Sequence, residues 1–151
     1  MRHNPCDGKV KGRIICTSSL AGIEPEPAVP QYSGAKAGVI HFARATAPVL
    51  WEKDAITMNV VCPGLVTTPL APKELLDASL PEHRTSMELV LRAFDDFIDR
   101  DDGKRNGEVV AAHAAKITEV GKSYLTDTVD GADESVRRVS KVLMRLVQGD
   151  E

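Results

Sequence analysis

The stretch Gly12-Arg13-Ile14-Ile15-Cys16-Thr17-Ser18-Ser19 begins as a short apolar run and ends in two hydroxyl side chains. The length and β-branched content of residues 13–17 predict a buried strand. A second near-continuous apolar run covers residues 56–62 and stops at Pro63-Gly64, which predicts another strand that ends in a turn. Residues 108–112 form a third candidate strand.

The segments between these strands have helical periodicity. Residues 30–50 are rich in alanine and carry one broad apolar stripe, which predicts a helix opened by Pro30. Pro48 lacks a backbone donor and predicts a kink or an early end of this helix. Thr85 or Ser86 can cap a further helix, whose apolar positions are Met87, Val90, Leu91, Phe94 and Ile98.

Strand, helix, strand, helix, strand at this spacing predicts βαβ units and a parallel sheet. The proline-rich residues 65–84 are expected to form a loop with a helical turn near 74–78, and residues 133–147 a charged amphipathic helix. We expect a polar lead (1–11), an α/β half-domain (12–116) and a helical extension (117–151).

The composition of the chain excludes several functional classes. Nineteen basic and 22 acidic residues give a net charge of -3 without a basic cluster, which argues against a nucleic-acid or anionic-membrane partner. Cys6, Cys16 and Cys62 lack metal-ligand spacing, and the four histidines show none either, so no metal site is expected. The apolar runs are too short to cross a bilayer. A reduced, cytoplasmic location is the expectation.

Three side chains could carry chemistry. Tyr32 and Lys36 are four residues apart on the predicted helix, so they project from one face. An ammonium group beside a phenol favours the phenolate, and such a phenol can exchange a proton with a substrate oxygen. Ser19 follows the first strand, where open α/β sheets bind ligands. Alone, a Tyr and Lys at this spacing is more often an ordinary surface pair, but here the strand, serine, helix and Pro-Gly turn occur in order.

This order resembles the short-chain dehydrogenase/reductase family over residues 12–70. The matching segments read Gly12-Arg-Ile-Ile-Cys-Thr-Ser-Ser-Leu-Ala-Gly22, Gln31-Tyr-Ser-Gly-Ala-Lys-Ala-Gly38 and Asn59-Val-Val-Cys-Pro-Gly-Leu-Val-Thr-Thr68. The resemblance implies a Rossmann-like, doubly wound parallel sheet of about three strands with flanking helices. It suggests more weakly the hydroxyprostaglandin-dehydrogenase-like branch of the family.

The resemblance also implies roles for individual residues. Ser19, rather than Ser18, would position the substrate oxygen, Tyr32 would act as the acid/base, and Lys36 would tune Tyr32 and bind the nicotinamide ribose. The residues implied to bind NAD or NADP are Tyr32, Lys36, Pro63, Gly64, Val66 and Thr68. The implied substrate is an alcohol or ketone, and the implied assembly is a homodimer or homotetramer through the long helices.

The family's cofactor-binding half would precede Gly12, and no G-x-G-x-x-G pattern occurs in the chain. We therefore expect only the C-terminal, catalytic half, with the strand at residues 13–17 open along one edge. Two hypotheses follow. The first is an oxidoreductase that transfers hydride between a nicotinamide cofactor and a secondary alcohol or ketone. The second is a truncated, inactive remnant or a half-domain that serves only as an interaction surface.

Overall fold

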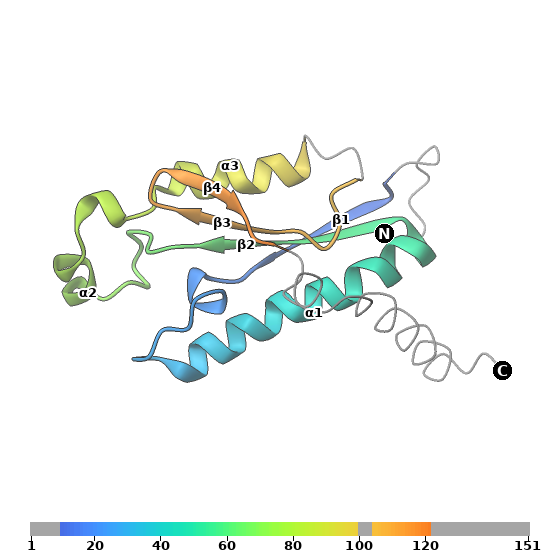
Figure 1. The fold of residues 1–151 in the computed structure, drawn as a ribbon. Coiled ribbons are helices and arrows are strands. Elements are labelled where there is room, and N and C mark those ends of the chain that lie inside the picture. The colour runs from blue at the N-terminus through green and yellow to red at the C-terminus, as the bar shows by residue number, and fades with distance from the viewer. Residues whose placement is uncertain (1–9, 100–103, 122–151) are drawn as a thin grey trace. The chain divides into compact units, whose positions relative to one another are not determined.

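The computed structural model describes residues 10–99 and 104–121, which contain a single sheet with flanking helices (Figure 1). In sheet order its strands are β1 (Gly12–Thr17), β2 (Ile56–Pro63), β3 (Val109–His113) and β4 (Lys116–Glu119). The pairs β1–β2 and β2–β3 are parallel, whereas β3–β4 is antiparallel. The partial Rossmann-like α/β fold is therefore confirmed.

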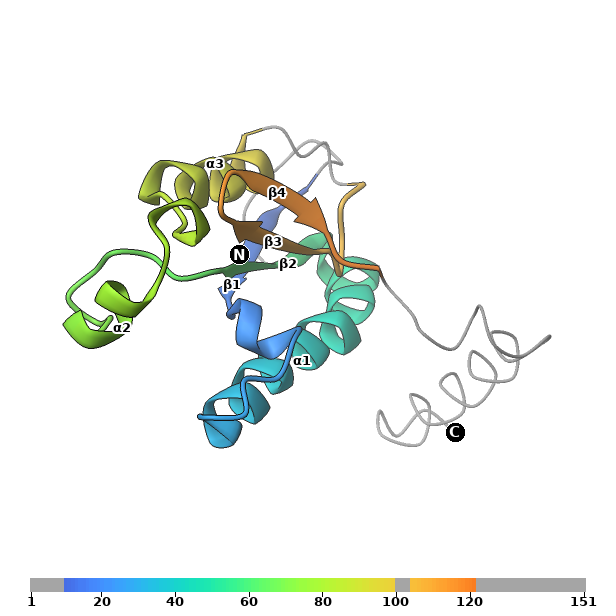
Figure 2. The same ribbon diagram turned by 60° about the vertical axis from the view of Figure 1, so that its left-hand side comes forward.

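The two long helices cover opposite faces of the sheet (Figures 1 and 2). Helix α1 (Pro30–Asp54) packs on Met58, Val60 and Cys62 of β2, while α3 (Met87–Ile98) packs on Val61 of the same strand. Successive side chains of a strand point to opposite faces, so β2 contributes to both cores. This double burial explains why β2 is apolar almost throughout, as parallel strands between helices usually are.

Pro48 does not end the long helix. Helix α1 continues through it to Asp54, so the expectation of an early end was wrong. Proline removes one backbone donor, but Ala43 and Ala47, in the turns that precede Pro48, remain fully buried against the sheet. Tertiary packing therefore maintains the helix despite the missing hydrogen bond. The helix closes at Ala55, whose left-handed backbone lets its N–H bond to the carbonyls of Leu50 and Trp51.

Strand β4 is an element that the sequence did not predict. Its four residues pair with β3 after the turn at Ala114, which has a positive φ of 50°. The strand is short and mostly exposed, so it lacks the apolar pattern of a buried strand. It extends the sheet past residue 116, where the predicted half-domain ended, and the domain boundaries themselves stay predictions. Residues 1–9 and the predicted helix 133–147 lie outside the described residues.

The connection after β2 contains short helical segments. These are α2 (Lys73–Ala78) and the 3-10 turn η2 (Pro81–His83); another 3-10 turn, η1 (Leu20–Gly22), follows β1. The helical turn expected near residues 74–78 is confirmed. Ser86 caps α3 by accepting a hydrogen bond from the N–H of Leu89 at 3.1 Å. Within residues 10–99 and 104–121, we find no helix with the length and apolar character of a membrane span.

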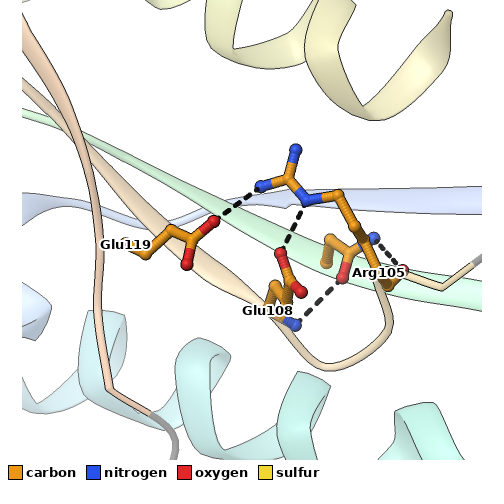
Figure 3. Close-up of polar contacts among 4 residues, drawn as sticks. Arg105, Glu108 and Glu119 are labelled. Atoms are coloured by element: carbon orange, nitrogen blue, oxygen red, sulfur yellow. Dashed lines mark hydrogen bonds and ion pairs between the residues drawn. The ribbon is translucent and has the colours of Figure 1, made fainter. Parts of the chain in front are cut away.

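The end of the sheet at which β2 begins is held by polar contacts around Arg105 (Figure 3). The Arg105 guanidinium forms an ion pair with Glu108 at 2.7 Å, contacts Glu119 at 3.9 Å and lies over the Phe97 ring. Buried Asn59 donates to the Arg105 carbonyl at 3.0 Å and accepts from the Glu108 N–H at 2.9 Å. These contacts join β2, β3, β4 and α3, so this edge of the sheet is structural.

Candidate active site

The three parallel strands end together at the edge of the sheet opposite Arg105. Thr17 ends β1, Pro63 ends β2 and His113 ends β3, and the pairing registers place Thr17 beside Val61 and Pro63 beside Ala112. The predicted site residues follow these ends or lie on the first turns of α1. Ligands of open α/β sheets bind at such carboxyl ends.

Tyr32 and Lys36 lie together near the end of β1. The Lys36 Nζ donates a hydrogen bond to the Thr17 carbonyl at 3.3 Å and lies 5.6 Å from the centre of the Tyr32 ring. The Tyr32 side chain is 44% exposed, so a small molecule can reach it. The spacing of four residues on one helix thus brings an ammonium group and a phenol together beside the strand end, as the sequence predicted.

The two adjacent serines differ in their surroundings. Ser18 is buried, and its hydroxyl donates to the Lys36 carbonyl at 2.7 Å. Ser19 is partly exposed, and its hydroxyl accepts from the N–H of Ala21 at 3.2 Å as the cap of η1. Ser18 therefore anchors the start of α1 to β1, whereas Ser19 has a hydroxyl within reach of solvent. This difference favours Ser19 as the residue that meets a substrate.

Gly22 permits the close approach of η1 to α1. A Cβ atom at this position would lie 2.7 Å from the Lys36 carbonyl carbon and 2.9 Å from the Ser18 Oγ. Real side chains do not tolerate such distances, so a residue without a Cβ is required here. The glycine that follows the serine therefore helps to set the position of Lys36.

The loop after β2 is pinned to its neighbours at both ends of its first turn. The Gly64 N–H donates to the Ala112 carbonyl at 2.9 Å, and the Leu65 carbonyl accepts from the Thr85 N–H at 2.7 Å. Val66 forms an isolated parallel bridge with Thr85. A Cβ atom at Gly64 would lie 2.8 Å from both the His113 ring and the Thr85 Oγ1. The predicted residues Pro63, Gly64 and Val66 thus belong to one fixed segment.

Thr68 is separate from that fixed segment. Its carbonyl accepts from the N–H of Ala71 at 3.0 Å, in the turn that leads toward α2. Its side chain is partly exposed. This contact of Thr68 belongs to the next turn, and its predicted role at a cofactor stays a prediction.

Thr85 is a site residue that sequence reasoning missed. It was considered only as a helix cap, but Ser86 fulfils that function. Thr85 is 2% exposed, and its hydroxyl lies 3.4 Å from the Ala112 carbonyl and 3.2 Å from the Ala114 N–H. No local pattern marks this position because its partners lie more than 25 residues further along the chain.

Cys62 lies on β2, immediately before Pro63 of the candidate site. Burial raises the pKa of its thiol to about 11, although the Ser18 hydroxyl, the Ser19 backbone and the charges of Arg44 and Lys36 act in the opposite direction. Burial likewise raises the pKa of Cys16. Both residues belong to the core beneath α1, so they are packing residues with neutral thiols.

Comparisons with known proteins show the family to which the chain belongs. The model of the short chain dehydrogenase family matches residues 4–78. The short-chain dehydrogenase/reductase prx6 of Penicillium rubens is 41% identical over 117 residues, which are 78% of this chain and 38% of that protein. The chain belongs to the short-chain dehydrogenase/reductase family. Mouse 15-hydroxyprostaglandin dehydrogenase [NAD(+)] is 42% identical over 65 residues, or 42% of this chain and 24% of that enzyme.

Solved structures of this family have the same fold. The 3-hydroxyacyl-CoA dehydrogenase type-2 of Mycobacterium avium matches with a TM-score of 0.60 and 27% identity, over 74% of this chain and 45% of that one. The structure of ElxO with NADP bound matches with a TM-score of 0.56 at 22% identity, over 66% of this chain and 44% of that one. The chain thus spans less than half the length of prx6 and of both structures.

Proposed function

We propose that this chain carries the catalytic residues of an oxidoreductase that transfers hydride between a nicotinamide cofactor and a secondary alcohol or ketone. The observation that carries this proposal is the position of Lys36. Its ammonium group is hydrogen-bonded to the Thr17 carbonyl at the carboxyl end of β1 and lies beside the Tyr32 ring. The partly exposed Ser19 follows Thr17 by two residues. Membership of an oxidoreductase family supports the reaction class.

Tyr32 is proposed as the acid/base. When the alcohol is oxidised, its hydroxyl proton passes to the Tyr32 oxygen; in the reverse direction Tyr32 returns that proton to the carbonyl oxygen. The Lys36 ammonium, 5.6 Å from the centre of the Tyr32 ring, places a positive charge beside the phenol. The Ser19 hydroxyl donates a hydrogen bond to the substrate oxygen and holds it near Tyr32. The bound nicotinamide would accept or supply the hydride.

The segment after β2 fits the nicotinamide end of such a cofactor. In a trans peptide the C=O and the following N–H point in opposite directions. Because the Leu65 carbonyl faces Thr85, the N–H of Val66 points away from Thr85 and is oriented as a donor. We propose that this N–H, with Pro63, Gly64 and Thr68, holds the nicotinamide carboxamide, while Tyr32 and Lys36 bind the ribose.

The setting of this activity is also proposed. The free thiols of Cys16 and Cys62 suit a reducing compartment, so we propose a cytoplasmic enzyme that acts on a small molecule. We further propose a homo-oligomer, as the family resemblance implies. A branch assignment near the hydroxyprostaglandin dehydrogenases stays a prediction.

Isothermal titration calorimetry of the purified 151-residue chain with NADH and NADPH tests the proposal. We expect one of the two to bind at a single site, and Lys36→Ala to weaken that binding. Lys53→Ala serves as the matched control because Lys53 lies at the other end of α1. If neither NADH nor NADPH binds, this chain is excluded as a free-standing enzyme of this type.

A second candidate is an inactive half-domain that acts through an interaction surface. It is favoured by the place of β1 at the end of the sheet, where, among the described residues, no strand pairs with its other edge. An unpaired edge is a template for another strand. A cooperative thermal melt of a monomer that binds a dinucleotide would count against this candidate.

A further inference from the structure

The hydroxyl of Thr85 connects three segments that meet at the carboxyl edge of the sheet. It lies 3.4 Å from the carbonyl of Ala112, which is the next-to-last residue of β3 and also accepts the N–H of Gly64. It accepts the N–H of Ala114, in the turn between β3 and β4, at 3.2 Å. The buried Thr85 hydroxyl therefore contacts the end of β3 and the turn that follows it. Through the Ala112 carbonyl it is also linked to the start of the loop after β2.

The backbone of Thr85 transmits this anchoring to the loop. Its N–H holds the Leu65 carbonyl at 2.7 Å, and the trans geometry of that peptide sets the direction of the Val66 N–H. A shift of Thr85 would therefore change the direction of the Val66 backbone N–H. On the other side, Gly64 is enclosed by the His113 ring and the Thr85 Oγ1, which leave no room for a Cβ atom.

We propose that Thr85 is a positioning residue that aims the backbone N–H of Val66 at the nicotinamide carboxamide. This inference rests on the proposed function for the identity of the group that Val66 meets. The anchoring of the loop itself rests only on the contacts of Thr85. Thr85 touches neither substrate nor cofactor and acts through Leu65 and Val66.

The test uses the full 151-residue chain and compares Thr85→Val with Thr85→Ser. Valine preserves the volume but removes the hydroxyl and leaves the partly buried Ala114 N–H without its acceptor, whereas serine retains the hydroxyl. Amide hydrogen exchange is followed by NMR at Gly64, Thr85 and Ala114, whose N–H groups make the hydrogen bonds of this anchor. We expect exchange at these amides to be about tenfold faster in Thr85→Val, with wild-type rates restored in Thr85→Ser.

Thr57→Val is the matched control. Thr57 is a fully buried threonine of β2, and no residue in the described part of the chain bonds its hydroxyl. Its substitution removes the same atom at the other end of the strand, so the amides of the loop should exchange at wild-type rates. Equal acceleration in Thr57→Val and Thr85→Val would overturn the inference, because it would indicate a general loss of stability.

Measurements of nucleotide binding separate a failure of the proposed function from a failure of the role inferred for Thr85. The nucleotide that binds wild-type protein should bind Thr85→Val about tenfold more weakly and Thr85→Ser normally. If neither NADH nor NADPH binds the wild-type chain, the proposed function fails, while the exchange rates still decide whether Thr85 holds the loop. Faster exchange with unchanged affinity would overturn the role of Thr85 toward the cofactor, and unchanged exchange would overturn the anchoring as well.

Discussion

Ser18 and Ser19 have the same side chain and adjacent positions, yet the structure uses them differently. Ser18 is buried and bonded to the carbonyl of Lys36, while Ser19 is partly exposed at the cap of η1. The sequence could separate them only through the family spacing to Tyr32. The physical reason for the difference is the long-range contact with α1, which no local pattern reveals.

At the residue scale, the end of α1 offers a stability prediction. Ala55 adopts φ 51° and ψ 41°, a left-handed conformation that costs about 1 kcal/mol or more for residues with a Cβ atom. Ala55→Gly should therefore raise the free energy of unfolding by about 1 kcal/mol in urea denaturation. Ala45→Gly, at an exposed position inside the same helix, should lower it by about 1 kcal/mol. A loss of stability in Ala55→Gly would contradict the left-handed cap.

The buried thiol of Cys62 makes stability depend on alkaline pH. Its pKa rises from 9.0 to about 11 because burial disfavours the thiolate. Below pH 9 the Cys62 thiol is protonated in both the folded and the unfolded state, so its contribution to the free energy of unfolding is fully present. As pH rises from 9 toward 11, the unfolded state loses this proton first, and stability falls.

Urea denaturation at a series of pH values checks this expectation. The decline of the unfolding free energy over that range should be shallower in Cys62→Ala than in the wild type, whatever the loss of packing does to the overall level. Parallel curves for the two proteins would show that Cys62 titrates alike in both states.

At the scale of elements, burial on two faces determined what could be predicted. The strand at residues 56–62 and the presence of both long helices were predicted correctly because each packs broadly against the core. The apolar positions predicted for α3 were partly wrong, because Met87, Leu91 and Ile98 are about half exposed. The residues of α3 that the core buries are Leu89, Val90, Ala93 and Phe97. The extent of α1 beyond Pro48 was missed because packing of Ala43 and Ala47 outweighs one lost hydrogen bond. Strand β4 and the role of Thr85 depend on distant partners, so local periodicity carried no signal for them.

The contact between η1 and α1 gives a prediction at this scale. Gly22→Ala would force a methyl group against the Lys36 backbone and the Ser18 hydroxyl, so the element must shift. We expect the free energy of unfolding to fall by about 1–3 kcal/mol, as overpacked sites do. Gly38→Ala is the control, because nothing surrounds that position and alanine favours the helix by up to about 1 kcal/mol. A Gly22→Ala protein as stable as the wild type would refute the close approach.

At the scale of the whole molecule, the described residues form a sheet whose parallel strands carry the proposed catalytic residues at their carboxyl ends. The ends of β1, β2 and β3 collect Ser19, Tyr32, Lys36 and the Gly64 loop, while the contacts of Arg105 stabilise the opposite edge. The sequence predicted this gathering because parallel strands place their carboxyl ends together. The substrate was beyond prediction, since residues 65–84 have no pattern that names a ligand.

The transfer of hydride itself tests the central claim most directly. The purified chain is mixed with NAD or NADP and a panel of secondary alcohols, and formation of the reduced nicotinamide is followed by its absorbance. We predict turnover with at least one alcohol, a loss of about 100-fold or more in kcat for Tyr32→Phe, and near wild-type rates for Phe42→Leu, an exposed substitution on the same helix. Turnover by Tyr32→Phe at the wild-type rate would contradict the account.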